Sequence, residues 1–421
     1  METAVEYLCP GEKAGISRAV HLGRLARYYT RCRSCPHRGD AASLSARRIK
    51  RLAATWQRAA PKPLFHEEGA GGDSVNEFSP AVARGIAAAF GIRLRDRRRA
   101  GADESPEPPV AILGGDGSPL CPELVAAVAE GLRWTGCHVV DVGPVTAACL
   151  THALHHLEAD GGILAGRGNG VGRRVGGVGL KFWHGASPLS AGHAMDEIRG
   201  IFESGVNRPT RRYGAIRRFP AEPAYLAGLS EHYHALRPLK VVLDTDSGPL
   251  LASLKTLTSR VACRLLPCRT TPRQLGGLVR DEGAHLGLCV DADGECSEAW
   301  DESGRAIPAE RLLGLLARHL LPGQGGQAVV LEEGWSESLT DAFGAWGGRV
   351  VRSDPRRAEM DRQIRQHCAI LGGDRCGRIW YYRPEGYAAA DALKTITLLL
   401  EILSQSDRPL SEVLDDNRSA R

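Results

Sequence analysis

The chain has 421 residues, of which 43% are hydrophobic and 24% are charged, and its formal net charge at pH 7 is +5. This length is too great for one ordinary core, and the composition is typical of globular proteins rather than of disordered, fibrous or membrane proteins. The small, dispersed positive charge argues against nucleic-acid binding, and no apolar run is long enough to span a membrane. The acidic first residues lack an apolar export region, so we expect a cytoplasmic protein.

The N-terminal segment concentrates cysteines and histidines. Cys32 and Cys35 form a C-x-x-C pair, a spacing that lets two sulfurs face one tetrahedral ion. Cys9 and His21 could complete a Cys3His zinc site, with His37 as the substitute for His21. An iron–sulfur cluster is less favoured because only three cysteines are available, and a reduced pair without a metal is the third interpretation. A small metal-bound segment would offer a surface for a protein partner.

From residue 110 onwards, apolar strands alternate with helices, which is an α/β pattern. Two segments rich in charge, Pro and Gly are predicted to be linkers, 93–109 and 203–220. The predicted strands are 110–113, 137–143, 162–165, 239–243, 286–290, 328–331 and 369–371, and the predicted helices are 122–135, 147–158, 221–236, 249–257, 308–321 and 388–404. We therefore predict an α/β protein in which a Cys/His-rich extension at 1–62 precedes three serial domains at 63–203, 204–307 and 308–421.

The other cysteines and a histidine cluster have structural interpretations. His152 and His156 fall one helical turn apart, and a partly exposed helix face explains them better than a metal site. Cysteines among apolar neighbours are predicted to fill the core, namely Cys121, Cys137, Cys149, Cys263, Cys268, Cys289, Cys368 and Cys376.

One segment, GGDGSPLCPEL at 114–124, is followed by a predicted helix and by the strand CHVVDVG. This order resembles the α-D-phosphohexomutase (phosphoglucomutase/phosphomannomutase) family, in which G-R-D-x-R-x-S-S-P-E-L precedes a helix and a strand that ends in D-x-G. FHEEGAGG at 65–72 and GLKFW at 179–183 stand in the family's order too, and the resemblance covers roughly 63–415. It implies α/β/α domains with mixed sheets.

The family's chemistry depends on a serine in T-A-S-H-N-P, which carries a phosphoryl group between two hydroxyls of a hexose phosphate while Mg²⁺ offsets the phosphate charge. Here the matching stretch is AGRGNG at 165–170, which places Arg167 at the nucleophile position. A guanidinium stays protonated and offers no oxygen, so it cannot carry the phosphoryl group. Lys181, within GLKFW, matches a family lysine that assists proton transfer.

The family's magnesium loop, D-G-D-G-D-R, corresponds to DADGEC at 291–296. Asp291, Asp293 and Glu295 retain the three carboxylates that the resemblance implies as Mg²⁺ ligands. If Arg167 lay beside them, its charge could replace the charge of the metal.

The family's sugar-binding loop, G-E-x-S-G-H, corresponds to GGDRCGR at 372–378, and Asp374, Cys376 and Arg378 stand where substrate-binding side chains are implied. Only a few residues follow PLSEV at 409–413, so we expect the family's fourth, phosphate-gripping domain to be missing. The resemblance thus implies a degenerate homologue that binds a hexose phosphate or a protein partner without mutase turnover. An active Mg²⁺-dependent phosphosugar mutase or phosphotransferase and a zinc-bound interaction protein are the alternatives.

Overall fold

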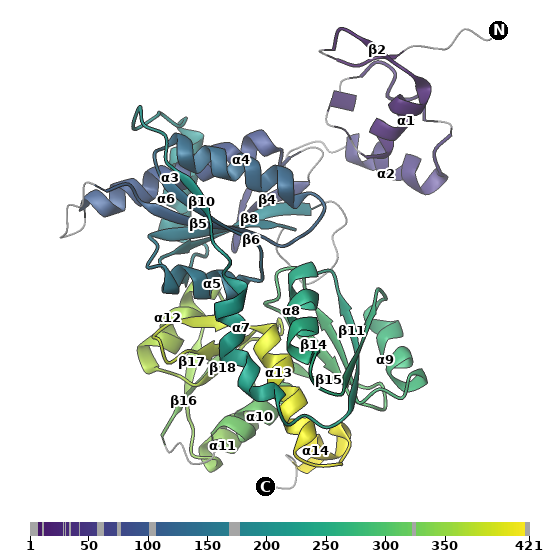
Figure 1. Cartoon of the computed structure of the whole chain (residues 1–421), viewed down its shortest axis with the longest axis vertical. Helices are drawn as coiled ribbons and strands as arrows, with labels where there is room; N and C mark the ends of the chain where they lie inside the picture. Colours follow the sequence, from purple (N-terminus) through teal and green to yellow (C-terminus); the bar gives the residue numbers. More distant parts are fainter. Residues whose placement is uncertain are drawn as a thin grey trace.

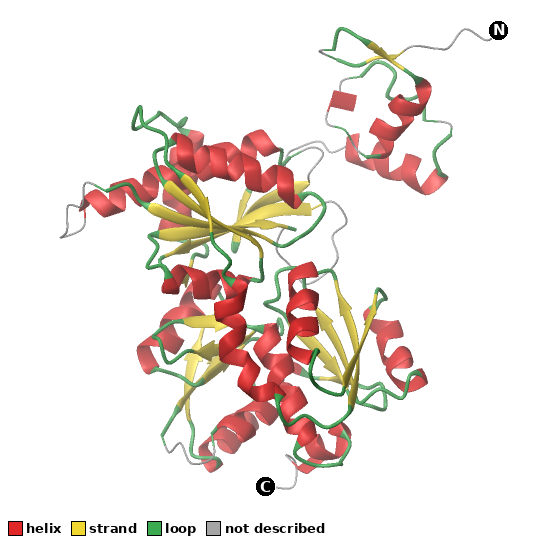
Figure 2. Cartoon of the chain, in the orientation of Figure 1, coloured by secondary structure: helices red, strands yellow, loops and turns green. Residues whose placement is uncertain are grey.

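The computed structural model of the chain describes residues 7–10, 12–27, 29, 31–32, 35–41, 43–56, 63–73, 77–100, 107–167, 177–321 and 326–416. A small N-terminal unit precedes three sheets that are each flanked by helices (Figures 1 and 2). This arrangement confirms the predicted multi-domain α/β class. The N-terminal unit consists of the antiparallel strands β1 (Tyr7–Leu8) and β2 (Gly15–Ile16) and the helices α1 (Arg18–Ala26) and α2 (Ala46–Trp56).

The first domain is built on an eight-stranded mixed sheet of order β10-β6-β5-β7-β8-β4-β3, with β9 paired to β8. Its strands are β3 (Phe65–His66), β4 (Gly69–Asp73), β5 (Val110–Gly115), β6 (His138–Pro144), β7 (Gly161–Gly166), β8 (Gly177–His184), β9 (Ser187–Pro188) and β10 (Ile216–Arg218). Its helices are α3 (Pro80–Ala100), α4 (Cys121–Trp134), α5 (Ala147–His156) and α6 (His193–Glu203). Alternate strand residues serve two cores, since Ala111 and Leu113 pack with α3 and α4 whereas Ile112 packs with α5.

The second and third domains share one topology. Each has a five-stranded sheet in which three parallel strands are followed by two antiparallel ones, in the orders β12-β11-β13-β14-β15 and β17-β16-β18-β19-β20. The second domain contains α7 (Glu222–Ser230), η2 (Glu231–Tyr233), β11 (Leu239–Thr245), α8 (Gly248–Thr258), β12 (Cys263–Cys268), α9 (Pro272–Asp281), β13 (Leu286–Val290), β14 (Ser297–Trp300) and β15 (Ala306–Ile307). The third contains α10 (Ala309–Leu320), β16 (Ala328–Glu332), α11 (Glu337–Ala345), β17 (Arg349–Ser353), α12 (Arg357–His367), β18 (Leu371–Gly373), β19 (Ile379–Tyr382), β20 (Ala388–Ala390), α13 (Ala392–Ser404) and α14 (Leu410–Asp416).

All three sheets repeat one unit, and this repetition positions the candidate site. In each domain the third parallel strand turns back into an antiparallel neighbour, through the hairpins β7–β8, β13–β14 and β18–β19. The predicted carboxylate and sugar-binding loops lie in the turns β13–β14 and β18–β19, whereas of the predicted AGRGNG loop only 165–167 are described and 168–170 lie outside the described residues. The carboxyl ends of parallel strands share one edge of a sheet, so each domain presents its turn from the same edge.

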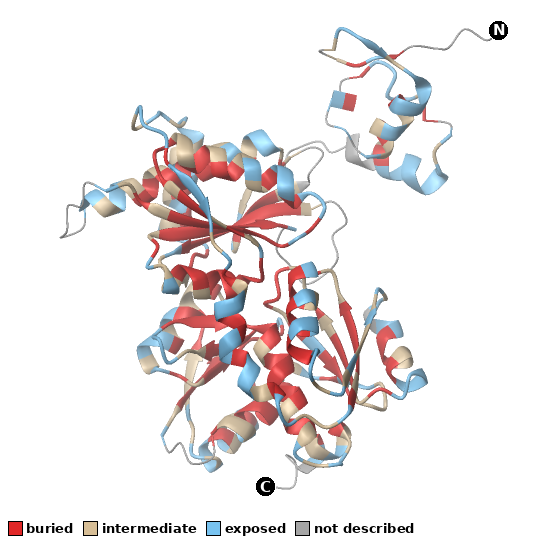
Figure 3. Ribbon diagram, viewed as in Figure 1, coloured by how far each residue is buried: buried red, intermediate tan, exposed pale blue. Residues whose placement is uncertain are grey.

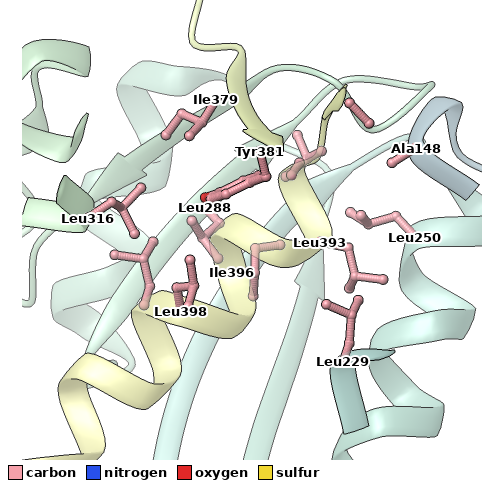
Figure 4. Packing of buried hydrophobic residues seen from close by; sticks show 14 of the residues in the cluster. Ala148, Leu229, Leu250, Leu288, Leu316, Ile379, Tyr381, Leu393, Ile396 and Leu398 are labelled. Atoms are coloured by element: carbon pink, nitrogen blue, oxygen red, sulfur yellow. The ribbon is translucent and has the colours of Figure 1, made fainter. Parts of the chain in front are cut away.

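Helix α13 joins the domains through a shared core. Its residues Leu393, Ile396 and Leu398 pack among side chains from α8, α10 and β19 (Figure 4). It is buried along almost its whole length, as the red colour of the central helices in Figure 3 shows. Fully burying one such side chain contributes about 1.5–3 kcal/mol, so α13 is a main source of interdomain stability.

Three sequence predictions differ from the structure. The linker predicted from residue 93 begins instead as the last turns of α3, because Arg93 is buried and its Nε lies 2.8 Å from Glu197 Oε2 of α6. The first domain continues past the predicted boundary at residue 203, since β10 pairs in parallel with β6. Residues 388–390 form β20 rather than the start of α13, because they pair with β19.

The cysteines predicted to fill the core behave differently from one another. Cys121, Cys137 and Cys149 are buried as expected, whereas Cys368 and Cys376 are exposed, and Cys263, Cys268 and Cys289 are partly buried.

None of the helices in the described ranges is both long enough and apolar enough to cross a lipid bilayer.

Helix α5 contacts the third domain through its histidines. His152 Nδ1 lies 3.0 Å from the hydroxyl of Tyr387, and the ring of His155 stacks on Tyr387 with centroids 4.9 Å apart. Burial lowers the pKa of His152, and the neighbouring charges of His156 and Arg383 lower it further. This contact therefore depends on an uncharged imidazole.

We predict that the contact weakens in acid. The unfolded chain, with a histidine pKa of about 6.5, takes up the proton before the folded chain does. The stabilisation is thus fully present above pH 6.5 and is lost as the pH falls through the lower folded value. The Tm of His152→Gln, measured from pH 7.5 to 5, should fall less steeply than that of the wild type. His193→Gln, at an exposed position, should leave the wild-type slope unchanged, and an unchanged slope in His152→Gln would contradict the assignment.

Candidate functional site

The turn between β13 and β14 lies where the three domains meet. The backbone carbonyl of Asp293 accepts a hydrogen bond from the amide of Ala147 at the start of α5, 2.8 Å away. The carbonyl of Gly294 accepts one from Ala392 at the start of α13, 3.0 Å away. Gly294 has a φ of +75°, a conformation that favours glycine. The carboxylates of this turn are thus held between the first and third domains.

A chain of buried ion pairs runs through this junction. The Lys181 ammonium, from β8, contacts Asp293 Oδ2 and lies 2.6 Å from Glu295 Oε2. The other oxygen of Glu295 lies 2.7 Å from Nη2 of Arg357, the first residue of α12. Arg357 is 1% exposed, and its guanidinium carbon lies 4.6 Å from the ring centroid of Trp183. Each buried charge therefore has an opposite charge beside it, as a low-dielectric environment requires.

The same chain continues into the loop between β3 and β4 and the turn after β18. Arg357 Nε lies 3.6 Å from Glu68 Oε2, and Arg378 Nη1 lies 3.2 Å from Glu68 Oε1. Arg378 Nε in turn lies 2.7 Å from Asp374 Oδ2. The network thus connects side chains of all three domains.

The carboxyls of Asp291 and Asp293 differ in their electrostatics. Burial raises the pKa of Asp291 well above its usual range, and repulsion from Asp293 raises it further. Burial also acts to raise the pKa of Asp293, but the Lys181 ammonium, the hydrogen bond with Asp291 and the charge of Arg357 together lower it. Burial opposes the charge of Lys181, yet Asp293 and Glu295 raise its pKa overall. At neutral pH, Lys181 therefore faces an ionised Asp293 carboxylate.

Arg167 follows β7 and lies at the edge of this junction. Its backbone amide donates to Asp116 Oδ2 over 2.7 Å, and its Nη1 lies 2.5 Å from Asp246 Oδ2 in the loop after β11. Any larger residue at Gly166 would clash with this carboxyl group, because a Cβ there would lie 2.3 Å from the Asp116 carboxyl carbon. The hypothesis that Arg167 neutralises the carboxylate turn is wrong, since its guanidinium pairs with Asp246 and Lys181 takes the neutralising position instead.

The turn after β18 is organised by its own side chains. Asp374 Oδ1 accepts hydrogen bonds from the amides of Cys376 and Arg378, at 3.0 and 3.1 Å. Burial raises the pKa of Asp374 to about 6, although Arg378 acts to lower it. Asp374 and Arg378 are buried and satisfy one another, whereas Cys376 is exposed. Their proposed contact with a sugar stays a prediction.

The space at the centre of the junction is small. The hollow lined by Asp116, Gly166, Arg167, Lys181 and Asp293 measures ≈ 10 Å³ for the centres of water molecules, which is room for about one water. None of the described residues that line it carries a hydroxyl group. This hollow is too small to hold a sugar ring.

The zinc site proposed for the N-terminal cysteines stays a prediction. Burial, followed by the charges of Cys9 and Cys35, raises the pKa of Cys32 to about 11. The ring of His21 stacks on Tyr7 with centroids 4.1 Å apart, and its Nε2 lies 3.2 Å from the carbonyl oxygen of Asp40. Across the described part of the chain, no group of three or more Cys, His, Asp or Glu side chains is arranged to hold a metal ion. The arrangement therefore gives no support to zinc.

Sequence reasoning missed three residues of the site. Asp116 and Glu68 lie within the motifs GGDGSP and FHEEGAGG. These motifs indicated that the two segments belong to the site, but they did not indicate what either side chain contacts. Arg357 lies in no motif, and the adjacent Arg356 is half-buried. No sequence signal distinguishes the buried arginine from its neighbour.

Comparison with known proteins identifies relatives of this chain. A family model described as "Phosphoglucomutase/phosphomannomutase, alpha/beta/alpha domain I" matches residues 62–165. A phosphomannomutase/phosphoglucomutase from Pseudomonas syringae is 26% identical over 319 residues, which cover 71% of this chain and 66% of that protein. A phosphomannomutase from Escherichia coli K12 is 27% identical over 346 residues, covering 75% of this chain and 74% of that protein. The chain thus matches about two thirds to three quarters of these relatives' length.

Solved structures show the same fold. A phosphoglucomutase/phosphomannomutase family protein from Burkholderia thailandensis superposes with a TM-score of 0.73 at 22% identity, covering 83% of this chain and 78% of that one. The phosphoglucomutase parafusin from Paramecium superposes with a TM-score of 0.63 at 14% identity, covering 85% of this chain and 74% of that one.

We predict that Arg357→Ala is strongly destabilising, because it leaves Glu295 and Glu68 buried without this partner. Breaking a buried ion pair typically costs about 3–5 kcal/mol. Urea unfolding should therefore show a lower free energy of unfolding by about that amount. Arg356→Ala, in which the adjacent arginine lies at the surface, is the matched control and should change stability little. Equal effects of the two substitutions would contradict the role given to the buried network.

Proposed function

We propose, from the premise that this chain belongs to the phosphoglucomutase/phosphomannomutase (α-D-phosphohexomutase) family, that it is a degenerate member that binds a hexose phosphate without running the phosphoserine mutase cycle. The family's reaction needs a hydroxyl oxygen that accepts and returns a phosphoryl group. The proposal rests on the absence of that oxygen from the position where the family places it.

The observation that carries the proposal is the composition of one segment. From Gly161 to Lys181 the sequence contains no Ser, Thr or Tyr. The first hairpin turn therefore has no hydroxyl to phosphorylate, whichever residue is aligned with the family's serine. Arg167 has a protonated guanidinium with five N–H donors and no acceptor. It can bind a phosphate group but cannot carry one covalently.

Two further hydroxyls lie close to the carboxylate turn, those of Thr146 and Ser297, and among the described residues the Oγ of Ser297 has no hydrogen-bond partner. Thr146 packs beside Gly294, but it is buried and its Oγ1 accepts a hydrogen bond from the amide of Cys149, so it caps α5. Ser297 is buried at the start of β14. Neither side chain lines the central hollow described above.

Arg167 is the side chain best suited to a phosphate ligand. Its side chain is 41% exposed, and its described carboxylate partner is Asp246 alone. A phosphate group could take the place of that carboxylate through a bidentate contact of the same geometry. Sugar-phosphate binding would then occur at the mouth of the junction, where Arg167 lies.

The family generally uses Mg²⁺, and that ion would offset phosphate charge where it is bound. In this chain Lys181 and Arg357 already face the carboxylates of the turn. Lys181 holds a proton at Nζ and is buried against Glu295, so it is not poised to take a proton from a sugar hydroxyl. These residues support binding and orientation rather than turnover.

A mutase assay tests the proposal. The full chain is incubated with glucose 1-phosphate or mannose 1-phosphate, Mg²⁺ and the corresponding 1,6-bisphosphate. We expect no conversion to the 6-phosphate and no phosphorylated protein after incubation with labelled bisphosphate. Conversion that Asp293→Ala abolishes would contradict the proposal and favour an active Mg²⁺-dependent enzyme.

Binding is tested separately by thermal shift. Glucose 6-phosphate should raise the Tm of the wild-type chain, and Arg167→Met should remove this shift because it removes the phosphate-binding guanidinium. Arg264→Met, at an exposed position on β12, is the control and should keep the shift. An equal shift in wild type and Arg167→Met would contradict the role of Arg167.

A further inference from the structure

The carboxylate turn of the second domain is where the family resemblance predicts a divalent cation, and its side chains do not fit one in this chain. We infer that the ammonium group of Lys181 takes the place and the charge of that cation. The inference rests on the contacts of Lys181 and does not depend on whether the chain binds or converts a sugar phosphate.

The first argument is an account of the carboxylate oxygens. Asp291 Oδ1 accepts hydrogen bonds from the amides of Glu295 and Cys296, at 2.9 and 3.0 Å. Glu295 uses one oxygen for Lys181 and the other for Arg357. Asp293 Oδ2 contacts the same ammonium. Most of the oxygens that could bind a metal are therefore committed to protein donors.

The second argument concerns the geometry that a metal would need. Mg²⁺ requires near-octahedral oxygen ligands at about 2.0–2.1 Å. Within the described residues, Asp293 Oδ1 is the buried oxygen of this turn that has no hydrogen-bond donor. With Asp291 Oδ2, for which the contacts above name no donor, two carboxylate oxygens remain, and two are too few for the six ligands that the ion needs. A metal could bind only after Lys181 had left both of its carboxylate partners.

The third argument concerns space and charge. Lys181 is 8% exposed, and the hollow beside it has room for about one water molecule. Its displaced ammonium would find no other place in the hollow. Lys181 and Arg357 already place two positive charges against Asp293 and Glu295, so a divalent ion would add two more positive charges beside them in a buried site. Both effects oppose metal binding while Lys181 is present.

The local fold explains why Lys181 reaches this position. Strand β8 pairs with β7 so that Lys181 lies opposite Leu164, while its neighbours Leu180 and Phe182 point into the core of the first domain. Alternation along the strand then directs Lys181 to the opposite face, toward the second domain. A covalently attached cation on a rigid strand cannot be diluted or chelated, so it holds the two domains together at any metal concentration.

The test uses Mn²⁺, whose free form gives an electron paramagnetic resonance signal that falls when the ion binds protein. We expect the full wild-type chain, dialysed free of metal, to bind no Mn²⁺ at the carboxylate turn. Adding this chain should therefore leave the signal of sub-millimolar free Mn²⁺ undiminished. Lys181→Ala should gain one bound Mn²⁺ per chain, because the carboxylates then lose their resident cation. The double variant Lys181→Ala/Asp293→Asn should lose the gained site, and Lys255→Ala, at an exposed position on α8, should behave as the wild type.

Two results would overturn the inference. One is a Mn²⁺ ion bound to the wild-type chain and lost in Asp293→Asn, which would show that the turn holds a metal despite Lys181. The other is a folded Lys181→Ala chain that binds no Mn²⁺ at this turn. If Lys181→Ala does not fold, melting of the wild type with and without Mg²⁺ decides the question. We expect no change in Tm, and a rise in Tm that Asp293→Asn abolishes would contradict the inference.

Discussion

A single buried chain of ion pairs constrains the arrangement of the three domains. It runs from Lys181 through Glu295 and Arg357 to Glu68, and on through Arg378 to Asp374. Buried charges are costly unless each has a partner, and here the partners come from β8, α12 and loops in all three domains. The position of one domain therefore determines whether charges in the other two are compensated. The apolar contacts of α13 add stability, but the ion pairs specify the relative orientation of the domains.

The repeated topology explains why so many charges meet at one place. In each sheet the third parallel strand is followed by an antiparallel one, and the junction gathers side chains from β8, from the turn between β13 and β14 and from the turn after β18. In a phosphohexomutase this geometry gathers a nucleophile, a metal and sugar-binding side chains from three domains. In this chain Arg167 follows β7, and Lys181 lies against the carboxylates of the second turn, which is the basis of the function proposed above. The framework is thus separable from the reaction that it supports in relatives.

The sequence predicted the α/β class and most of the strands and helices from 110 onwards, because apolar periodicity reports burial directly. It failed where pairing between distant segments decides the structure. Residues 388–390 were predicted to be part of a helix, but they form β20 because they pair with β19. The charged run from residue 93 read as a linker, although Glu197, about a hundred residues away, pairs with Arg93. The loops of the site were likewise predicted from local motifs. The partner of Arg167 and the role of Arg357 could not be predicted, because they depend on contacts between domains that no local sequence pattern encodes.

The central claim is that an ammonium group, rather than a metal ion, lies between Asp293 and Glu295. A crystal structure of the full chain grown with excess Mn²⁺, with data collected at the manganese absorption edge, tests it most directly. The account predicts Lys181 Nζ within hydrogen-bonding distance of both carboxylates and no anomalous peak at the turn. An anomalous peak coordinated by Asp291, Asp293 and Glu295, with the Lys181 side chain turned away, would contradict it.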